Sequence, residues 1–428
     1  MRHKPNRNVD YRKMMEQFNT TVCIVGAGPA GTITSMFLAK FGIGSLLVDK
    51  TVFPRDKICG DAIGFMAIEV LNKLMPEIVT NLIEEEIRIV PRGVKIVAPN
   101  LKEIELPFIE EHSMANKLTG FISKRFNFDN FLVDQAKTLK DIRILEGYEV
   151  DFYQRSQNGW LLRTKDKRLE IRTKLLIIAD GAYSHFAHHI GNIKMEQEHY
   201  CAGVRGYYNG VTNLGRDNFM EVHFLRELLP GYLWIFPLPN GLSNVGIGMR
   251  SDIISKNKIN LREKLREIID KYPTLQTRFK NSELIGELKG HGLPIGSKYR
   301  KISGSNYMLV GDAASLINPF TGEGIGVAMR TGMLAAYQAQ VSIRENDFSE
   351  SFLRRYEIAV YKELQNELNF SLKIRRLAKL FWIINFVVGK ANRNKLLTDA
   401  MSNMFININV RNQFRNPFFY LKLLFSNR

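Results

Sequence analysis

Cysteine is scarce in this chain, and its pattern argues against several classes of protein. The three cysteines, Cys23, Cys59 and Cys201, are an odd number and include no C-x-x-C pair. This argues against a disulfide framework and a cysteine zinc site, and it favours a reducing cytoplasm. The chain also lacks a run of the roughly 18 apolar residues that a membrane span needs. Residues 1–20 are basic but contain no apolar segment of the kind that signal peptides carry.

Acidic residues are too few to balance the basic ones, which leaves a net charge of +17 at pH 7. Such a charge suits nucleic acid, an anionic membrane or an acidic substrate. Residues 368–428 hold eleven Lys and Arg against one acid, Asp399, interleaved with "LFWIINFVV" and "NPFFYLKLLF". Basic residues mixed with Trp, Phe and Leu suit an anionic lipid surface better than a duplex. We therefore expect no nucleic-acid partner, and a cytoplasmic protein held peripherally on the inner face of a membrane.

From residue 346 onward the pattern is helical. Asp347 and Glu350 resemble a capping box at the start of a helix. Apolar residues then recur at every fourth position, which predicts one buried stripe made of Phe352, Tyr356, Val360, Leu364, Leu368 and Leu372. The helices of this region can dock on lipid, or they can fold back over the substrate domain with their basic residues in solvent. The two arrangements are compatible.

A nucleotide-binding pattern opens the folded part of the chain. The run "TVCIVGAG" at residues 21–28 predicts a buried parallel strand. In the G-x-G-x-x-G that follows, Gly26 permits a tight turn, Gly28 lets a pyrophosphate approach the backbone, and Gly31 lets the next helix pack closely. That helix start offers free N–H groups to a phosphate. A second strand, "SLLVD", ends at Asp49, whose carboxylate can accept both hydroxyls of an adenosine ribose.

Two later strand ends separate FAD from NAD. The stretch "LLIIADGAYS" ends a strand at Asp180-Gly181, and "YMLVGDAASLINPFTGEGIG" ends another at Gly311-Asp312. Taken alone, the two aspartates could simply cap helices. In this order, however, the chain resembles the FAD-dependent oxidoreductases of the aromatic-hydroxylase fold. The resemblance implies that Asp312 binds the ribityl chain and that the P-x-x-G-x-G segment (Pro319, Gly322 and Gly324) lies along the flavin ring.

The same resemblance implies further contacts to FAD. It places an arginine, here Arg125, before a helix, and it turns the backbone of Val150 toward the adenine. The expected FAD-binding residues are Gly26, Gly28, Ala30, Gly31, Asp49, Lys50, Arg55, Cys59, Gly60, Arg125, Val150, Asp180, Gly181, Asp312, Pro319, Gly322, Gly324 and Ile325. Only one nucleotide fingerprint is present, so NADPH or reduced ferredoxin would donate electrons from a transient site.

Two segments indicate the branch of this fold. The loop "FPRDKICGDA" at residues 53–62 and the strand "GYLWIFPL" at residues 231–238 resemble the geranylgeranyl reductase family. In that strand Tyr232, Trp234 and Phe236 alternate with apolar residues, so the three rings share one face. That face is either ordinary core or the wall of a long apolar pocket. The resemblance favours a pocket for a polyprenyl chain, with these three residues binding substrate.

By the same resemblance, Cys59, Tyr232 and Trp234 are the candidates for catalysis. Alkene reduction needs a hydride from flavin N5 and a proton, and the protein must align the chain and exclude water. Tyr232 offers a hydroxyl for this purpose. Cys59 is either a proton donor or substrate gate, or merely a small residue under the flavin, and the sequence leaves both open.

The expected function is an FAD-dependent reductase that saturates double bonds of a polyprenyl chain on a lipid, quinone or diphosphate. One alternative is an FAD-dependent monooxygenase or halogenase acting on an apolar or aromatic substrate, although halogenases carry W-x-W-x-I-P where Tyr232 and Phe236 stand here. A second alternative is a non-catalytic prenyl carrier on the same fold. His185, His188 and His189 invite a metal site, but a solvated helix face is the simpler interpretation, and we expect no metal.

The expected fold is α/β: a Rossmann-like FAD-binding domain, an inserted antiparallel-sheet substrate domain and a helical C-terminal region. The boundaries that we expect are 1–18 for a basic extension, 19–90, 112–190 and 285–345 for the FAD-binding domain, 91–111 and 195–284 for the substrate domain, and 346–428 for the basic amphipathic helices.

Overall fold

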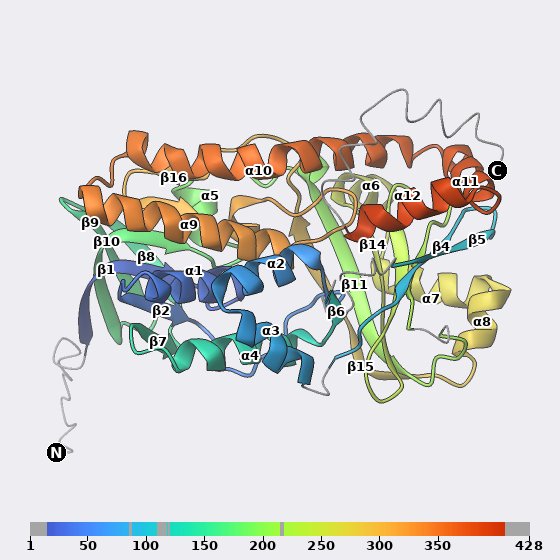
Figure 1. The fold of residues 1–428 in the computed structure, drawn as a ribbon, viewed down its shortest axis with the longest axis horizontal. Helices are drawn as coiled ribbons and strands as arrows, with labels where there is room; N and C mark the ends of the chain where they lie inside the picture. Colours follow the sequence, from blue (N-terminus) through green and yellow to red (C-terminus); the bar gives the residue numbers. More distant parts are fainter. Residues whose placement is uncertain (1–14, 85–87, 109–117, 119, 215–217, 407–428) are drawn as a thin grey trace, which may run out of the picture.

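The computed structural model describes residues 15–84, 88–108, 118, 120–214 and 218–406. Two large sheets lie next to each other, and helices cover them (Figure 1). The first sheet has eight strands: β1 (Glu16–Val25), β2 (Ser45–Asp49), β7 (Ile142–Glu146), β8 (Val150–Ser156), β9 (Gly159–Thr164), β10 (Leu169–Ile178), β16 (Ser303–Gly304) and β17 (Tyr307–Leu309). The second has seven: β4 (Gly93–Val97), β5 (Glu103–Pro107), β11 (Tyr200–Asn209), β12 (Met220–His223), β13 (Tyr232–Pro237), β14 (Leu242–Arg250) and β15 (Glu283–Pro294).

The remaining elements are one small sheet and the helices. The small sheet pairs β3 (Ala62–Ile63) with β6 (Phe121–Ile122). The α-helices are α1 (Pro29–Lys40), α2 (Phe65–Leu74), α3 (Pro76–Glu84), α4 (Arg125–Lys137), α5 (His185–His189), α6 (Ser251–Asn257), α7 (Leu261–Lys271), α8 (Pro273–Phe279), α9 (Ile325–Glu345), α10 (Glu350–Leu377), α11 (Phe381–Ala391) and α12 (Lys395–Ile406), and the 3-10 turns are η2 (Gln197–His199) and η3 (Gly311–Ala314).

The centre of the first sheet is parallel, in the order β17-β10-β1-β2-β7. Its strands are apolar runs because helices cover the sheet, and residues 22–25 of β1 are all buried. This confirms the Rossmann-like part of the predicted fold. The strand starts at Glu16, earlier than the boundary at residue 19, because Glu16 already pairs with Leu169 of β10.

The second sheet is antiparallel except where β12 runs parallel to β4. Its strand order is β15-β11-β14-β13-β12-β4-β5, so the segments 91–111 and 195–284 do share a sheet. The predicted boundary at residue 285 is wrong, however, because β15 pairs with β11 over residues 283–294. One face of the sheet packs on α7 and α8, with Leu233 and Ile235 of β13 against Leu265 and Ile268 of α7.

The C-terminal helices extend from the first sheet to the second. Helix α10 runs beside α9 and continues toward the second sheet (Figure 1). Its N-cap is Ser349, which accepts the N–H of Phe352, so the capping box predicted at Asp347 is wrong by two residues. Asp347 instead accepts the N–H of Ser349.

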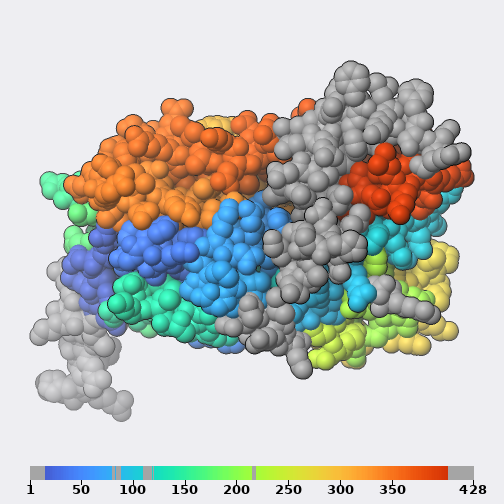
Figure 2. Space-filling model, viewed as in Figure 1, coloured from blue at the N-terminus to red at the C-terminus, as the bar shows by residue number. Residues whose placement is uncertain are grey.

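Helices α11 and α12 fold back on the second sheet. Val388 and Leu397 join an apolar cluster with Ile96 of β4 and Leu106 of β5. In the space-filling view α12 lies at the opposite end of the molecule from the end of α9 and the start of α10 (Figure 2). Among the residues that the structure describes, no helix is both long enough and apolar enough to cross a membrane. The segment "NPFFYLKLLF" lies outside the described residues.

Candidate active site

A cavity of about 740 Å³ lies where the carboxyl ends of the parallel strands meet the second sheet. Its wall includes Gly26 after β1, Lys50 after β2, Asp180 after β10 and Val310 after β17, and it continues onto β11, β13 and β14. The structure brings every predicted site residue to this wall except Gly31. Gly31 lies beneath the loop, where an added Cβ would stand 1.8 Å from the carbonyl oxygen of Gly26.

The glycine loop is tied to the end of β2 by Asp49. One carboxylate oxygen accepts the backbone N–H of Ala27 at 2.7 Å, and the other accepts the N–H of Thr51 at 2.8 Å. Gly26 has a φ of +104°, and an added Cβ would lie 2.4 Å from the carbonyl oxygen of Ala179, so no other residue fits there. The loop therefore brings its backbone close to any ligand in the cavity.

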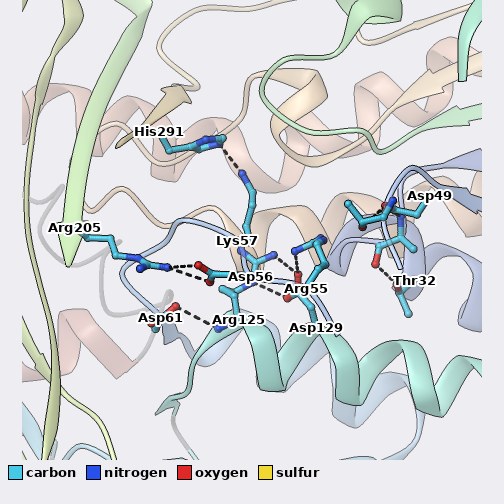
Figure 3. A network of polar contacts seen from close by, with 12 residues as sticks. Thr32, Asp49, Arg55, Asp56, Lys57, Asp61, Arg125, Asp129, Arg205 and His291 are labelled. Carbon is cyan, nitrogen blue, oxygen red and sulfur yellow. Dashed lines mark hydrogen bonds and ion pairs between the residues drawn. The ribbon is translucent and has the colours of Figure 1, made fainter. Parts of the chain in front are cut away.

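Two arginines share one buried carboxylate beside this loop. Asp129 on α4 accepts Nε and Nη2 of Arg125 at 2.6 and 2.7 Å, and it pairs with Nη1 of Arg55 at 2.9 Å (Figure 3). The cluster keeps one positive charge in excess. Arg55 also lies opposite Gly28, because a Cβ added there would be 3.6 Å from its Nη2. A pyrophosphate between the loop and Arg55 would compensate this charge.

The aspartates after β10 and β17 are half-buried acceptors on the same wall. Burial raises the pKa of Asp180 to about 6, and its Oδ1 has no hydrogen-bond partner among the described residues. Burial also raises the pKa of Asp312, against the nearby positive charges of Lys57 and Arg125. The carboxylate oxygens of Asp180 and Asp312 can accept hydrogen bonds from hydroxyl groups. FAD carries such hydroxyl groups on its ribose and its ribityl chain. The glycine cradle, the arginines and these acceptors fit FAD.

Lys57 and His291 were not predicted. Lys57 Nζ contacts His291 Nε2 across the cavity, joining the "PRDK" loop to β15 (Figure 3). Burial first, and then the charges of Lys57 and Arg125, lower the pKa of His291 to about 3. His291 is therefore neutral and accepts a hydrogen bond from the Lys57 ammonium. Nothing in the sequence around His291 indicates the contact, because it depends on how the two sheets face each other.

Asp61 is a third residue that the sequence did not indicate, although it lies in the loop "FPRDKICGDA". It is fully buried and accepts Tyr207 Oη and Asn244 Nδ2, each at 2.8 Å. Asn244 also donates to the carbonyl oxygen of Cys59 at 2.8 Å and accepts Trp234 Nε1 at 2.9 Å. One amide therefore fixes the Cys59 loop, the Asp61 carboxylate and the indole of Trp234. Burial raises the pKa of Asp61 to about 6.

The aromatic face of β13 borders the cavity. Leu233 and Ile235 are fully buried in the core, whereas Tyr232, Trp234 and Phe236 on the other face line the cavity. The indole of Trp234 lies flat over β14, where a Cβ on Gly246 would be only 2.3 Å from Trp234 Cζ2. The rings continue from Phe236 through Trp234 and Tyr232 to Phe224 and then Phe320, with centroid separations of 6.0–6.4 Å.

The Tyr232 hydroxyl and the Cys59 thiol, two of the three candidate catalytic groups, have different surroundings. Tyr232 Oη donates to the carbonyl oxygen of Thr321, next to Gly322, and burial raises its pKa. Its hydroxyl is thus committed to positioning the P-x-x-G-x-G segment. Burial also raises the pKa of the Cys59 thiol, with the Arg125 guanidinium acting in the opposite direction. Cys59 is therefore a protonated thiol on the cavity wall at neutral pH.

Comparison with known proteins agrees with this geometry. The family model of the FAD-binding domain matches residues 19–357. A digeranylgeranylglycerophospholipid reductase of Methanococcus vannielii is 30% identical over 366 residues, which cover 83% of this chain and 87% of that protein. The chain belongs to the geranylgeranyl reductase family of FAD-dependent oxidoreductases. A menaquinone reductase of Mycobacterium tuberculosis is 32% identical over 330 residues, which cover 74% of this chain and 75% of that protein.

Solved structures confirm the fold. A geranylgeranyl bacteriochlorophyll reductase-like protein of Thermoplasma acidophilum superimposes with a TM-score of 0.79, at 22% identity, over 96% of this chain and 97% of that chain. A flavin-dependent brominase shares the fold with a TM-score of 0.70 at 18% identity, over 94% of this chain and 99% of that chain. The family match and the reductase relatives show that the protein is an FAD-dependent oxidoreductase, and the solved structures show that halogenases share its fold.

The Asp312→Ala variant should lose much of its FAD during purification, because it removes a hydrogen-bond acceptor on the cavity wall worth about 0.5–1.5 kcal/mol or more. The measurement is the ratio of flavin to protein absorbance, with FAD identified after denaturation. Asp134→Ala, an exposed aspartate on α4, is the control and should keep its FAD. Full FAD content in the Asp312 variant would contradict the role of this residue.

The pKa of Asp61 predicts a pH-dependent stability. In the folded protein it is about 6, above the ordinary value of 3.8, so the folded state holds the proton over this interval and the unfolded state does not. Its contribution to the free energy of unfolding therefore falls as pH rises from about 4 to 6, by on the order of 2–3 kcal/mol. The Asp61→Asn variant should not show this fall. The difference in melting temperature, variant minus wild type, should therefore increase as the pH rises from about 4.5 to 7. A constant difference would contradict the raised pKa.

Proposed function

We propose that this protein saturates double bonds of a polyprenyl chain carried on a lipid, quinone or diphosphate. The observation that supports this is the continuous row of rings from Phe236 to Phe320 along the cavity. Beyond the rings the wall stays apolar, with Val94 and Ile96 of β4. A long uncharged chain matches such a wall, and rigid rings bury its surface at low entropic cost.

The residues of the chain would serve the reaction by alignment and by proton supply. When bound, FAD supplies the hydride. The indole of Trp234, fixed by Asn244, holds one face of the alkene, and Tyr232 holds the glycine segment beside it. We propose that the Cys59 thiol delivers the proton, because its raised pKa keeps it protonated and the nearby Arg125 charge would stabilise the thiolate left behind. NADPH or reduced ferredoxin is the proposed electron donor.

An anaerobic assay tests this proposal. The protein is reduced with dithionite, geranylgeranyl compounds are added, and flavin reoxidation is followed together with product mass. The expected result is reoxidation with a gain of two hydrogens per bond. An oxygenated or halogenated product in air, with stoichiometric oxygen consumption, would favour the monooxygenase or halogenase instead. NADPH and reduced ferredoxin can replace dithionite to identify the donor.

Two variants examine the site in the same assay. Trp234→Ala should cut turnover while keeping FAD, and Cys59→Ala should lower kcat with an unchanged KM. Trp160→Ala is the matched control, because Trp160 is buried in the core away from the cavity. It should lower the melting temperature, since truncating a core ring costs about 3–5 kcal/mol. If Trp234→Ala behaves like the control, the aromatic face serves packing alone.

We also propose that α11 holds the protein on anionic membranes. Trp382 and Phe386, one helical turn apart, are 58% and 54% exposed, whereas Ile384 and Val388 face the sheet. Exposed basic residues, among them Lys379, lie in the same region. Exposed rings beside cations suit the interface of an anionic bilayer. Helix α11 can therefore pack on the second sheet with one face and dock on a membrane with the other.

Liposome co-sedimentation tests this docking. The double variant Trp382→Ser/Phe386→Ser should bind anionic vesicles several-fold more weakly than wild type, and wild-type binding should weaken with salt. The control is Ile358→Ser, which removes an equally exposed apolar side chain from α10. Equal binding by all three proteins, or equal binding to neutral vesicles, would remove the membrane role from α11.

A further inference from the structure

Arg375, near the end of α10, differs from every other buried arginine that the structure describes. Four of them pair with carboxylates: Arg125 with Asp129, Arg205 with Asp56, Arg278 with Glu221, and Arg330 with Glu69 and Glu363. Arg300 instead donates to backbone carbonyls. Arg375 is 8% exposed and lines the cavity, and its Nη1 has no hydrogen-bond partner among the residues described.

The groups around Arg375 leave its charge uncompensated. It faces Cys201 of β11 and Arg250 of β14, which are register partners. Asp252 binds Arg250 through both carboxylate oxygens, so that pair is neutral. Burial raises the pKa of Cys201 to about 11, which leaves a neutral thiol. Within the residues that the structure describes, no carboxylate pairs with Arg375, and a buried guanidinium without an anion is costly.

This place is separate from the phosphate position at the glycine loop. There, Arg55 and Arg125 share Asp129 in the first domain, whereas Arg375 and Arg250 face the end of the second sheet. Gly248 lies two residues before Arg250 and pairs with Tyr232. The uncompensated charge therefore lies near the Tyr232 end of the three rings on β13, Phe236, Trp234 and Tyr232. A molecule that lies along these rings would therefore place one of its ends near the Arg375 guanidinium.

We propose that Arg375, with Arg250 beside it, binds a phosphate group of the substrate, so that the enzyme prefers prenyl chains on a phospholipid or diphosphate to neutral prenyl quinones and alcohols. A guanidinium presents two parallel donors that match phosphate oxygens, and the ligand supplies the missing negative charge. This inference rests on the proposed reductase activity and names the class of substrate for that site.

The experiment compares substrates with the same geranylgeranyl chain in the anaerobic assay: geranylgeranyl diphosphate, digeranylgeranylglycerophospholipid, geranylgeraniol and the menaquinone that carries a geranylgeranyl side chain. Arg375→Gln should raise KM for the two phosphate-bearing compounds by about tenfold or more, with little change in kcat and no change for the two neutral ones. Arg375→Lys should recover part of the loss. Arg376→Gln, which removes the same charge from the exposed neighbouring position, is the control and should match wild type. A loss confined to one phosphate-bearing compound identifies which of them is the natural carrier.

A measurement of melting temperature tests phosphate binding even if none of the compounds is reduced. Geranylgeranyl diphosphate should raise the melting temperature of the holoprotein more than geranylgeraniol does, and Arg375→Gln should abolish the difference. Equal effects of the variant on charged and neutral compounds, or none on either, would overturn the phosphate site while leaving the reductase intact. If wild type reduces none of the four compounds, the proposed function fails, and the melting comparison alone decides whether Arg375 binds phosphate.

Discussion

The amide of Asn244 is the contact on which the arrangement of the site depends. It is fully buried on β14 and makes three hydrogen bonds, to the Trp234 indole, the Cys59 carbonyl and the Asp61 carboxylate. Two of these partners belong to the loop after β2, and the third belongs to the second sheet. Because an unpaired buried amide would cost about 1–3 kcal/mol, the sheet and the loop are held in one relative position. The candidate proton donor and the aromatic wall are thereby fixed against each other.

Charge is distributed unevenly around the cavity, and the distribution follows the chemistry of the ligands. The Arg55, Arg125 and Asp129 cluster leaves one positive charge beside the glycine loop. Between this cluster and Arg375, the rings of β13 provide an uncharged surface. Most buried arginines elsewhere are neutralised by carboxylates, as Arg278 is by Glu221. The cavity thus has an uncompensated positive charge at each of two places, with an apolar wall between them. This arrangement suits two ligands that each carry a phosphate, FAD and the proposed substrate.

The C-terminal helices connect the pocket with the outer surface. The inner side of α11 packs through Ile384 and Val388 onto the strands that continue the apolar wall, and its outer side exposes Trp382 and Phe386. Helix α10 contributes Arg375 to the cavity and then leads into α11. Two consecutive helices, α10 and α11, therefore supply the proposed phosphate contact, the cover of the apolar wall and the proposed membrane contact.

The sequence by itself determined the local parts. Short-range patterns such as G-x-G-x-x-G after a β-branched run depend on backbone geometry within a few residues, so the strand that ends at Val25, the glycine loop and the helix after it could be predicted, as could the shared face of the three rings in β13. The start of that strand at Glu16 could not, because it depends on pairing with Leu169. Only the tertiary structure decided which face of β13 borders the cavity, that β15 joins the second sheet, and that Lys57 meets His291. It also decided that no carboxylate in the described part of the chain pairs with Arg375. Pairing between residues far apart in the chain depends on how the sheets and helices pack, and one sequence carries no local signal of it.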